Sequence, residues 1–295
     1  MKVLKFGGTS VGSVESLLNV KKIVESCTEQ VIVAVSALGG VTNQLLEMCD
    51  MAEAHDAAWE QTLEQVKQRH LNIIDAVCID GTQEQCRQVI EQFIDGNLRS
   101  YYGMLMVNQD LEDVVRAQVR DAIVAHGEIM SSAIVSCMIE NAIPHFSPRF
   151  IKTRDIEGQR RLDWEATEEL VKVEFEGSEE QRVVVQGFIA EDVETGLKTN
   201  LGRGGSDYTG AILAAILNAS CLEIWTDVDG FMTADPRKDP NATVIPEMTY
   251  EQAQEMCDAG AKVIYPPTIA PVAGKGIPVW VKNTFNPTAP GTVIK

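Results

Sequence analysis

The chain has 295 residues, of which 45% are hydrophobic, so it can bury a large core in one α/β domain or two closely joined lobes. It carries 25 lysines and arginines against 43 acidic residues, and the resulting net charge of −18 argues against nucleic acid and anionic membranes as partners. The positive charge that an anionic substrate needs must therefore be concentrated locally, which makes the few basic residues near glycines informative.

The seven cysteines form an odd set without a CxxC pair, which argues against a disulfide framework and a zinc site. No apolar run approaches the roughly 18 residues of a membrane span. Lys5 and the pair Gly7-Gly8 interrupt the apolar stretch at the N-terminus, so we expect no signal peptide. The expected compartment is the cytoplasm, with reduced thiols.

The first 35 residues predict a βαβ unit. Residues 3–6 form a short apolar strand, residues 14–24 an amphipathic helix, and residues 31–35 a β-branched run typical of a buried parallel strand. From about residue 44 to residue 136 the chain is rich in Glu, Gln, Leu, Ala and Met with helical spacing. This composition predicts a helical insertion.

The second half of the chain predicts strands and helices in alternation. The expected elements are a strand over 183–189, a hairpin turn at 194–196 that returns through 197–199, a helix capped by Ser206 that runs to residue 219, a strand over 222–226, a helix over 250–259 that stops at Gly260, and a strand over 277–284. This α/β pattern predicts a mostly parallel sheet covered by helices on both faces.

The first glycine-bearing turn follows the first predicted strand, at residues 5–10 (KFGGTS). Its spacing matches neither a Walker A loop nor G-x-G-x-x-G. Gly7 and Gly8 can bring backbone amides close to an anion, and Lys5 adds a full positive charge beside them. A plain tight turn is the alternative interpretation.

The second turn, residues 201–210, places three glycines and Arg203 directly before a helix. Arg203 can bind a carboxylate with two hydrogen bonds, and the helix N-terminus offers free N–H donors. Asp207 puts negative charge at the same place. It either caps the helix or orients lysines around a transferring phosphoryl group.

The third turn, residues 226–237, is a polar loop that follows a predicted strand. Its acidic spacing does not match an EF-hand, so we exclude calcium there. The loop fits a nucleotide site with Arg237 near the phosphates, and a solvated loop is the alternative. Together, the three turns indicate phosphoryl transfer by positioning and charge neutralisation.

No general base is required if the acceptor is a carboxylate, because a side-chain carboxyl group with a pKa near 4 is already ionised at pH 7. The histidines are accordingly interpreted as structural or surface residues. His126, beside Gly127 and Glu128, is the one expected near a site.

These motifs, in this order, resemble the aspartokinases of the amino acid kinase family. The segments that carry the resemblance are residues 5–10 (KFGGTS), 35–37 (VSA) with 41–43 (VTN), 127–128 (GE), 187–189 (GFI), 202–209 (GRGGSDYT), 226–230 (TDVDG) with 235–237 (DPR), and 260–263 (GAKV). The resemblance implies a three-layer αβα sandwich. It also implies an aspartate-binding lobe over residues 1–200, an ATP-binding lobe over 201–295, and no regulatory ACT domains in this chain.

The resemblance further implies roles for individual residues. Lys5 would stabilise the transferring phosphoryl group, Asp207 would organise the catalytic lysines, and Lys262 would neutralise the nucleotide phosphates. The residues implied for the aspartate pocket are Ser36, Thr42, Glu128, Phe188, Arg203 and Ser206. Those implied for ATP are Lys5, Gly7, Gly8, Thr226, Asp227, Met232, Arg237 and Lys262. Mg²⁺ would be carried by the ATP phosphates, and Met232 stands where several relatives have a tyrosine.

The activity implied is transfer of the ATP γ-phosphoryl group to L-aspartate, giving ADP and 4-phospho-L-aspartate at the start of lysine, threonine and methionine biosynthesis. The alternatives are a kinase of the same fold for glutamate, N-acetylglutamate or a nucleoside monophosphate, and a catalytically silent sensor. Glu128 paired with an α-ammonium group and Arg203 paired with a carboxylate favour a free amino acid. The full-length form is expected to be a homo-oligomer. The chain is either the catalytic part of a longer protein, such as a bifunctional aspartokinase/homoserine dehydrogenase, or a naturally short form.

Overall fold

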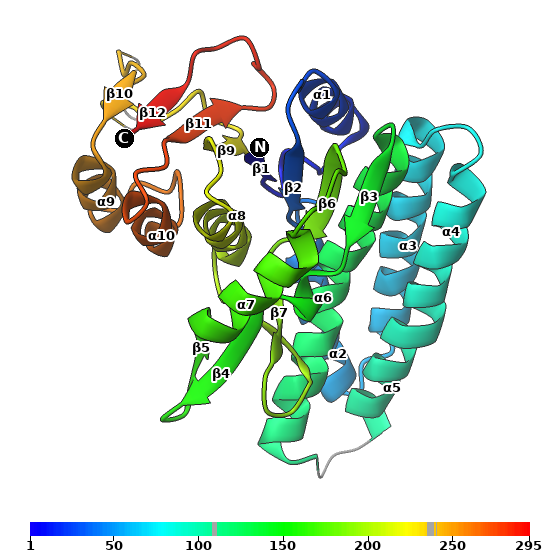
Figure 1. Ribbon diagram of the computed structural model, residues 1–295. Coiled ribbons are helices and arrows are strands. Elements are labelled where there is room, and N and C mark those ends of the chain that lie inside the picture. Colours follow the sequence, from blue (N-terminus) through cyan, green and yellow to red (C-terminus); the bar gives the residue numbers. More distant parts are fainter. Residues whose placement is uncertain (108–110, 235–238, 240) are drawn as a thin grey trace.

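The computed structural model covers residues 1–295 and describes all of them except 108–110, 235–238 and 240. In the described part of the chain, the main sheet has eight strands (Figure 1). In spatial order these are β10 (Glu247–Met248), β12 (Thr292–Ile294), β11 (Val279–Asn283), β9 (Leu222–Thr226), β1 (Lys2–Phe6), β2 (Val31–Val35), β6 (Arg182–Gln186) and β3 (Ala142–His145). Every neighbouring pair is parallel except β11 with β12. The predicted mostly parallel sheet is confirmed.

Helices cover both faces of this sheet (Figure 1). One face carries α1 (Val14–Glu25), α2 (Val41–Glu53), α3 (Ala58–Val77), α4 (Gln83–Glu91), a π-helical turn (Gln92–Leu98), α5 (Arg99–Val107) and α6 (Asp113–Met138). The other face carries α7 (Trp164–Phe175), α8 (Gly205–Ile216), α9 (Tyr250–Asp258) and α10 (Ile269–Ala273), and short 3₁₀ turns lie at Ser147–Arg149 and Pro266–Thr268. The three-layer sandwich and the helix-rich segment near residues 44–136 are therefore confirmed.

The central strands supply both halves of the core, because successive side chains on a strand point to opposite faces. Leu4 and Phe6 of β1 lie in the hydrophobic cluster beneath α1–α6, whereas Val3 lies in the cluster beneath α7–α10. The side chains of β2 alternate between the two clusters in the same way, and all five of its residues are buried. The uninterrupted apolar sequence of β2 is thus what a strand covered on both faces requires.

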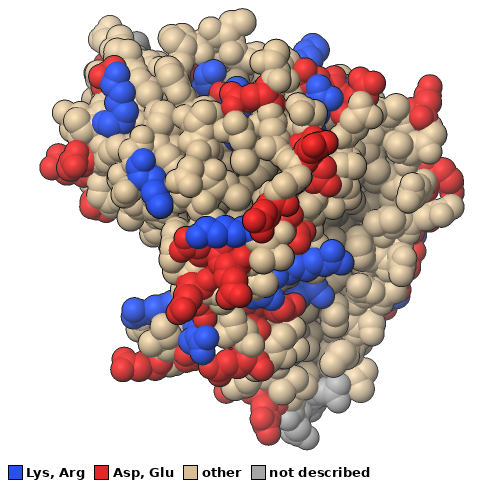
Figure 2. All heavy atoms as spheres, in the orientation of Figure 1, with Lys and Arg blue, Asp and Glu red and all other residues tan. Residues whose placement is uncertain are grey.

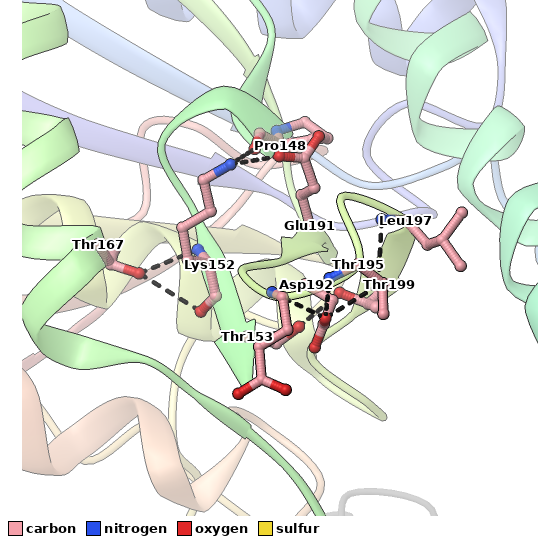
Figure 3. A network of polar contacts seen from close by, with 10 residues as sticks. Pro148, Lys152, Thr153, Thr167, Glu191, Asp192, Thr195, Leu197 and Thr199 are labelled. Atoms are coloured by element: carbon pink, nitrogen blue, oxygen red, sulfur yellow. Dashed lines mark hydrogen bonds and ion pairs between the residues drawn. The ribbon is translucent and has the colours of Figure 1, made fainter. Parts of the chain in front are cut away.

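A second sheet of four strands packs beside the first. Its order is β5 (Gln159–Leu162), β4 (Lys152–Ile156), β7 (Ile189–Asp192) and β8 (Lys198–Asn200). The predicted hairpin turn at residues 194–196 joins β7 to β8, and Asp192 accepts hydrogen bonds from the backbone of that turn (Figure 3). Strands β4 and β5 were not expected, because their polar, exposed residues show no apolar alternation.

The predicted strand over residues 183–189 is wrong in its extent. Strand β6 ends at Gln186, and Ile189 begins β7 of the second sheet. Between them Phe188 adopts φ +67°, and the Ile189 N–H donates to the Gly187 carbonyl at 2.7 Å, which closes a three-residue turn. A bulky residue with positive φ is rare, so an apolar run gave no warning of this break.

The predicted start of the helix after residue 204 is also wrong in detail. Helix α8 begins at Gly205 with Gly204 as N-cap, and no side chain caps it, so Ser206 lies inside the first turn. The helix ends at Ile216 rather than at residue 219. Strand β9 matches its prediction, and α9 differs from its prediction by one residue.

All seven cysteines are free thiols. Within the described ranges, no helix combines the length and the apolar character needed to cross a bilayer.

Replacing Ile32 by alanine should test the central position of β2. Ile32 is fully buried, so Ile32→Ala should lower the free energy of unfolding by roughly 2–5 kcal/mol through lost burial and a residual cavity. Ile143 on the edge strand β3 is 42% exposed, and Ile143→Ala should cost less than about 1 kcal/mol. Chemical denaturation measures the free energy of unfolding of both variants. Equal losses of stability in the two variants would contradict the observed strand order.

Candidate active site

The carboxyl ends of four adjacent parallel strands meet at one edge of the main sheet. Strand β1 pairs with β2 on one side and with β9 on the other, and β6 lies beyond β2. The chain runs from β1 to β2 and later returns to the other side of β1 through β9, so the strand order reverses there. Open α/β sheets bind ligands at this kind of position, because the loops on either side diverge.

These loops enclose a cavity of about 330 Å³. Many of the residues that line it are among the site residues predicted from the sequence. The expected residues that line it are Lys5, Gly8, Ser36, Thr42, Glu128, Phe188, Arg203, Ser206 and Asp207. Residues at the ends of β1, β2 and β6, from α6 and from the start of α8 are thus brought together, as expected for a site built from the loops of a parallel sheet.

Lys5 and Asp207 form a buried ion pair at the cavity wall. Lys5 Nζ lies 2.7 Å from Asp207 Oδ1, and the two residues are 8% and 9% exposed. Asp207 Oδ2 accepts a hydrogen bond from the Tyr265 backbone N–H at 3.1 Å. Asp207 therefore does not cap its own helix; it holds the ammonium group of Lys5 at the carboxyl end of the central strand.

Glu128 projects from α6 into the same cavity. Its Oε1 accepts a hydrogen bond from the Ala37 N–H at 3.1 Å, whereas its Oε2 is buried and has no hydrogen-bond partner among the described residues. Burial raises the pKa of this carboxyl group to about 8, against the opposing effects of the Ala37 N–H and Lys5. A buried polar atom without a protein partner is available for a hydrogen bond with a bound molecule.

Glycines allow the backbone segments around the cavity to approach one another. A Cβ atom on Gly127 would lie 2.9 Å from the Cβ of Ala37, and one on Gly187 would lie 2.6 Å from the Cβ of Ser206. Gly204 has φ +72°, and a side chain there would meet the Tyr265 ring at 2.3 Å. The close packing at this site therefore depends on glycine at all three positions.

Arg203 is the exposed basic group of the cavity. It forms no ion pair or hydrogen bond with any residue that the structure describes, whereas Lys5 is already paired. The Arg203 guanidinium is thus available for a ligand carboxylate, which it can bind with two parallel hydrogen bonds.

Comparison with known proteins identifies the family. Residues 1–283 match the sequence profile of the Amino acid kinase family. This chain belongs to the amino acid kinase family. The chain is 34% identical over 301 residues to a chloroplastic bifunctional aspartokinase/homoserine dehydrogenase of Daucus carota, covering 98% of this chain and 32% of that protein. It is 34% identical over 306 residues to chloroplastic aspartokinase 2 of Arabidopsis thaliana, covering 99% of this chain and 54% of that protein.

Solved structures show the same similarity. Escherichia coli aspartokinase III in complex with aspartate and ADP superposes with a TM-score of 0.88 at 31% identity, covering 100% of this chain and 64% of that one. The aspartate kinase of Clostridium acetobutylicum gives a TM-score of 0.77 at 26% identity, covering 100% of this chain and 63% of that one. The chain therefore spans between about a third and two thirds of the length of these relatives.

The residues expected to bind the nucleotide do not share the cavity, apart from Lys5 and Gly8. The Gly7 N–H donates to the Trp225 carbonyl at 3.0 Å, so it is already used. Thr226 donates to Asp227 at 3.2 Å, and Met232 forms an isolated β-bridge with Val244. Exposed Lys262 also does not line the cavity, and Arg237 lies outside the described residues. The nucleotide roles of these positions remain predictions.

Arg69 is a site-supporting residue that sequence reasoning missed. It projects from α3 and donates through Nη1 to the Gly39 carbonyl and through Nη2 to the Gly12 carbonyl, both at 2.9 Å. The two loops that it joins follow β1 and β2, and Gly8 and Gly39 of these loops line the cavity. A single arginine in a helical segment gives no local signal of such a contact, because its partners are distant in sequence.

Replacing Arg69 by methionine should impair turnover more than stability. Arg69→Met keeps an apolar stem but releases the two loops, and misplacement of the loops should lower kcat/KM by about 10²-fold. Steady-state kinetics measures the effect. Arg99→Met, which changes a partly exposed arginine at the start of α5, is the matched control and should leave kcat/KM within about twofold. A normal rate in Arg69→Met would show that the loops hold their positions without the guanidinium.

Glu128 should make stability depend on pH. Its folded pKa of about 8 lies above the usual value near 4.3, so the folded state binds more protons between these values. The free energy of unfolding should therefore fall as the pH rises from about 4.5 to about 8, and this component should be absent in Glu128→Gln. Denaturation of both forms across this range measures it, and parallel curves would contradict the burial of an ionisable group there.

Proposed function

We propose that the chain is an aspartate kinase, which converts ATP and L-aspartate into ADP and 4-phospho-L-aspartate. One observation carries the proposal: a single cavity presents the unsatisfied carboxyl oxygen of Glu128, the unpaired guanidinium of Arg203 and the ammonium group of Lys5. This arrangement complements a molecule with one ammonium group and two carboxylates. The similarity to aspartokinases, one of them solved with aspartate and ADP, supports the same substrate.

The site would recognise the substrate through its charged groups. Glu128 would accept from the α-ammonium group, and this contact would offset the cost of ionising a buried carboxyl group. Arg203 would bind one carboxylate. The hydroxyls of Ser36, Thr42 and Ser206 would supply further hydrogen bonds, and Phe188 would cover the apolar stem.

The reaction would proceed without a general base, because the β-carboxylate is already ionised at neutral pH. Lys5 would stabilise the transferring phosphoryl group, and Asp207 would hold Lys5 in place. His126 is engaged elsewhere: burial lowers its pKa to about 4, and its ring nitrogens contact the Ala122 carbonyl at 2.7 Å and Asn97 at 3.3 Å. This engagement supports a structural role for His126.

The nucleotide side of the site rests on the family resemblance. Lys262 would neutralise the phosphates, while Thr226, Asp227, Met232 and Arg237 would hold ATP together with the glycines of the first turn. The Asp207 carboxylate already uses both oxygens, on Lys5 and on the Tyr265 N–H. Mg²⁺ would therefore enter on the ATP phosphates, where it would neutralise charge.

The wider context is also proposed. The aspartate lobe would span residues 1–200 and the ATP lobe residues 201–295, joined by the continuous main sheet. The greater length of the relatives supports a whole protein that contains further domains. The family resemblance is the basis for proposing that it forms homo-oligomers and acts in lysine, threonine and methionine biosynthesis. Free thiols at all seven cysteines support a reducing, cytoplasmic location.

ADP release with alternative acceptors tests the activity. L-aspartate should support turnover. Glutamate should support less, because its side chain is longer by one methylene. N-acetylglutamate should support far less, because an acetylated amine leaves Glu128 Oε2 unsatisfied. A higher kcat/KM for either alternative would assign the chain to another kinase of this fold. No ADP release with any acceptor would favour a sensor.

Removing the proposed catalytic lysines should lower kcat. Lys5→Ala and Lys262→Ala should each reduce it by at least about 10²-fold, the typical cost of one preorganised electrostatic contact. Lys22→Ala, on the exposed side of α1, is the matched control and should not change kcat. Near-normal turnover in either of the first two variants would remove that lysine from the mechanism.

A further inference from the structure

A second cavity of about 510 Å³ adjoins the first, and nothing in the proposed reaction uses it. It lies between the second sheet and the start of α8. Its lining residues are Thr153, Arg160, Arg161, Leu162, Asn200, Leu201, Gly202 and Tyr208. Gly202 lines both cavities, so the loop that carries Arg203 separates them.

The second sheet gives this cavity a fixed floor. Thr153 of β4 and Thr199 of β8 share a buried hydrogen bond of 2.7 Å between their hydroxyls (Figure 3), which links these two strands although β7 lies between them in the sheet. Lys152, next to Thr153, is tied to the Pro148 carbonyl and to Glu191. The wall behind a ligand would therefore be rigid.

The free polar side chains of this cavity are hydrogen-bond donors. Arg161 contacts Gln159 Oε1 at 2.8 Å and pairs with no carboxylate among the described residues. The Tyr208 hydroxyl likewise has no partner within the described ranges. The amide of Asn200 is used at both ends, by Asp121 at 2.8 Å and by the Gly202 N–H at 3.0 Å.

The charged side chains that line the cavity are Arg160 and Arg161, and only one of these positive charges is not neutralised by a paired carboxylate. Arg160 is paired with Asp121 at 2.6 Å, which leaves Arg161 without a neutralising partner. Over the β4–β5 hairpin, basic and acidic side chains lie close together on an otherwise strongly acidic molecule (Figure 2). No acidic residue is among those that line the cavity, and Asp121 already accepts from Arg160 and Asn200, so the lining itself offers no carboxylate to an incoming ammonium group.

The remaining walls are apolar. Leu162, Leu201 and the ring of Tyr208 are half-buried and pack against the core cluster beneath α7–α10. A ligand that fits donors at the mouth and apolar walls inside must combine one negative group with an apolar body. We propose that this cavity binds a small monocarboxylate that carries a short branched or straight hydrocarbon chain and no amino group.

Binding there would favour the loop arrangement seen in this structure. Gly202 is anchored by Asn200, and its carbonyl accepts from the Gly205 N–H at 2.9 Å, so the loop that presents Arg203 is continuous with the second cavity. A ligand that binds this arrangement stabilises it over alternatives. This step rests on the proposed function, and it makes the ligand an activator that lowers the KM for aspartate.

Calorimetry with isovalerate and its neutral amide, isovaleramide, tests the site directly in the absence of aspartate and ATP. Isovalerate should bind with saturation, and the amide should bind at least about tenfold more weakly, because it lacks the charge that Arg161 recognises. Arg161→Gln should weaken isovalerate binding at least about tenfold, and Tyr208→Phe about fivefold. Arg149→Gln, an exposed arginine outside both cavities, should not change it.

Equal binding of the two probes, or unchanged isovalerate affinity in Arg161→Gln, would overturn the proposal. In kinetic assays saturating isovalerate should lower the KM for aspartate at least about fivefold in the unmodified chain and leave it unchanged in Arg161→Gln. A competitive rise in KM would place the probe in the first cavity and overturn the proposal as well. If aspartate is no substrate at all, the proposed function fails, while the calorimetric result still decides the second site.

Discussion

The ion pair between Lys5 and Asp207 joins the central strand β1 to the first turn of α8, and the candidate site is arranged around it. Both charges lie at about nine-tenths burial, 2.7 Å apart. Taking two charges out of water costs free energy that their attraction recovers only with good geometry and further hydrogen bonds, and the Tyr265 N–H supplies one of these to Asp207. Such a pair adds little to stability, but it places an ammonium group where a phosphoryl group would be transferred.

Close backbone packing around this pair determines the shape of the cavity. Gly187 brings the end of β6 against Ser206, Gly127 brings α6 against the loop after β2, and Gly204 leaves room for the Tyr265 ring. Arg69 then ties together the loops after β1 and β2 from the helical layer. The helix-rich segment thus does more than enlarge the core, because α3 and α6 both contribute to the site.

The electrostatics of the cavity favour one kind of ligand. The chain carries a net charge of −18, yet the cavity combines a paired lysine with an unpaired arginine. Glu128 is mostly protonated at neutral pH in the free chain, because burial raises its pKa to about 8. It therefore opposes an incoming dicarboxylate less than an ionised group would, and it can ionise when an ammonium group arrives. This behaviour favours a zwitterion over an acetylated analogue.

The sequence by itself determined the layers of the fold and the edge of the sheet where chemistry would occur. The runs at residues 31–35 and 222–226 match β2 and β9 residue for residue. For β2 the reason is that a strand buried on both faces needs continuous apolar side chains. Only the tertiary structure decided the partner of Asp207, the contacts of Arg69, the break at Phe188 and the second cavity. Local patterns report periodicity and turn chemistry, whereas these features depend on how segments far apart in the chain pack against one another.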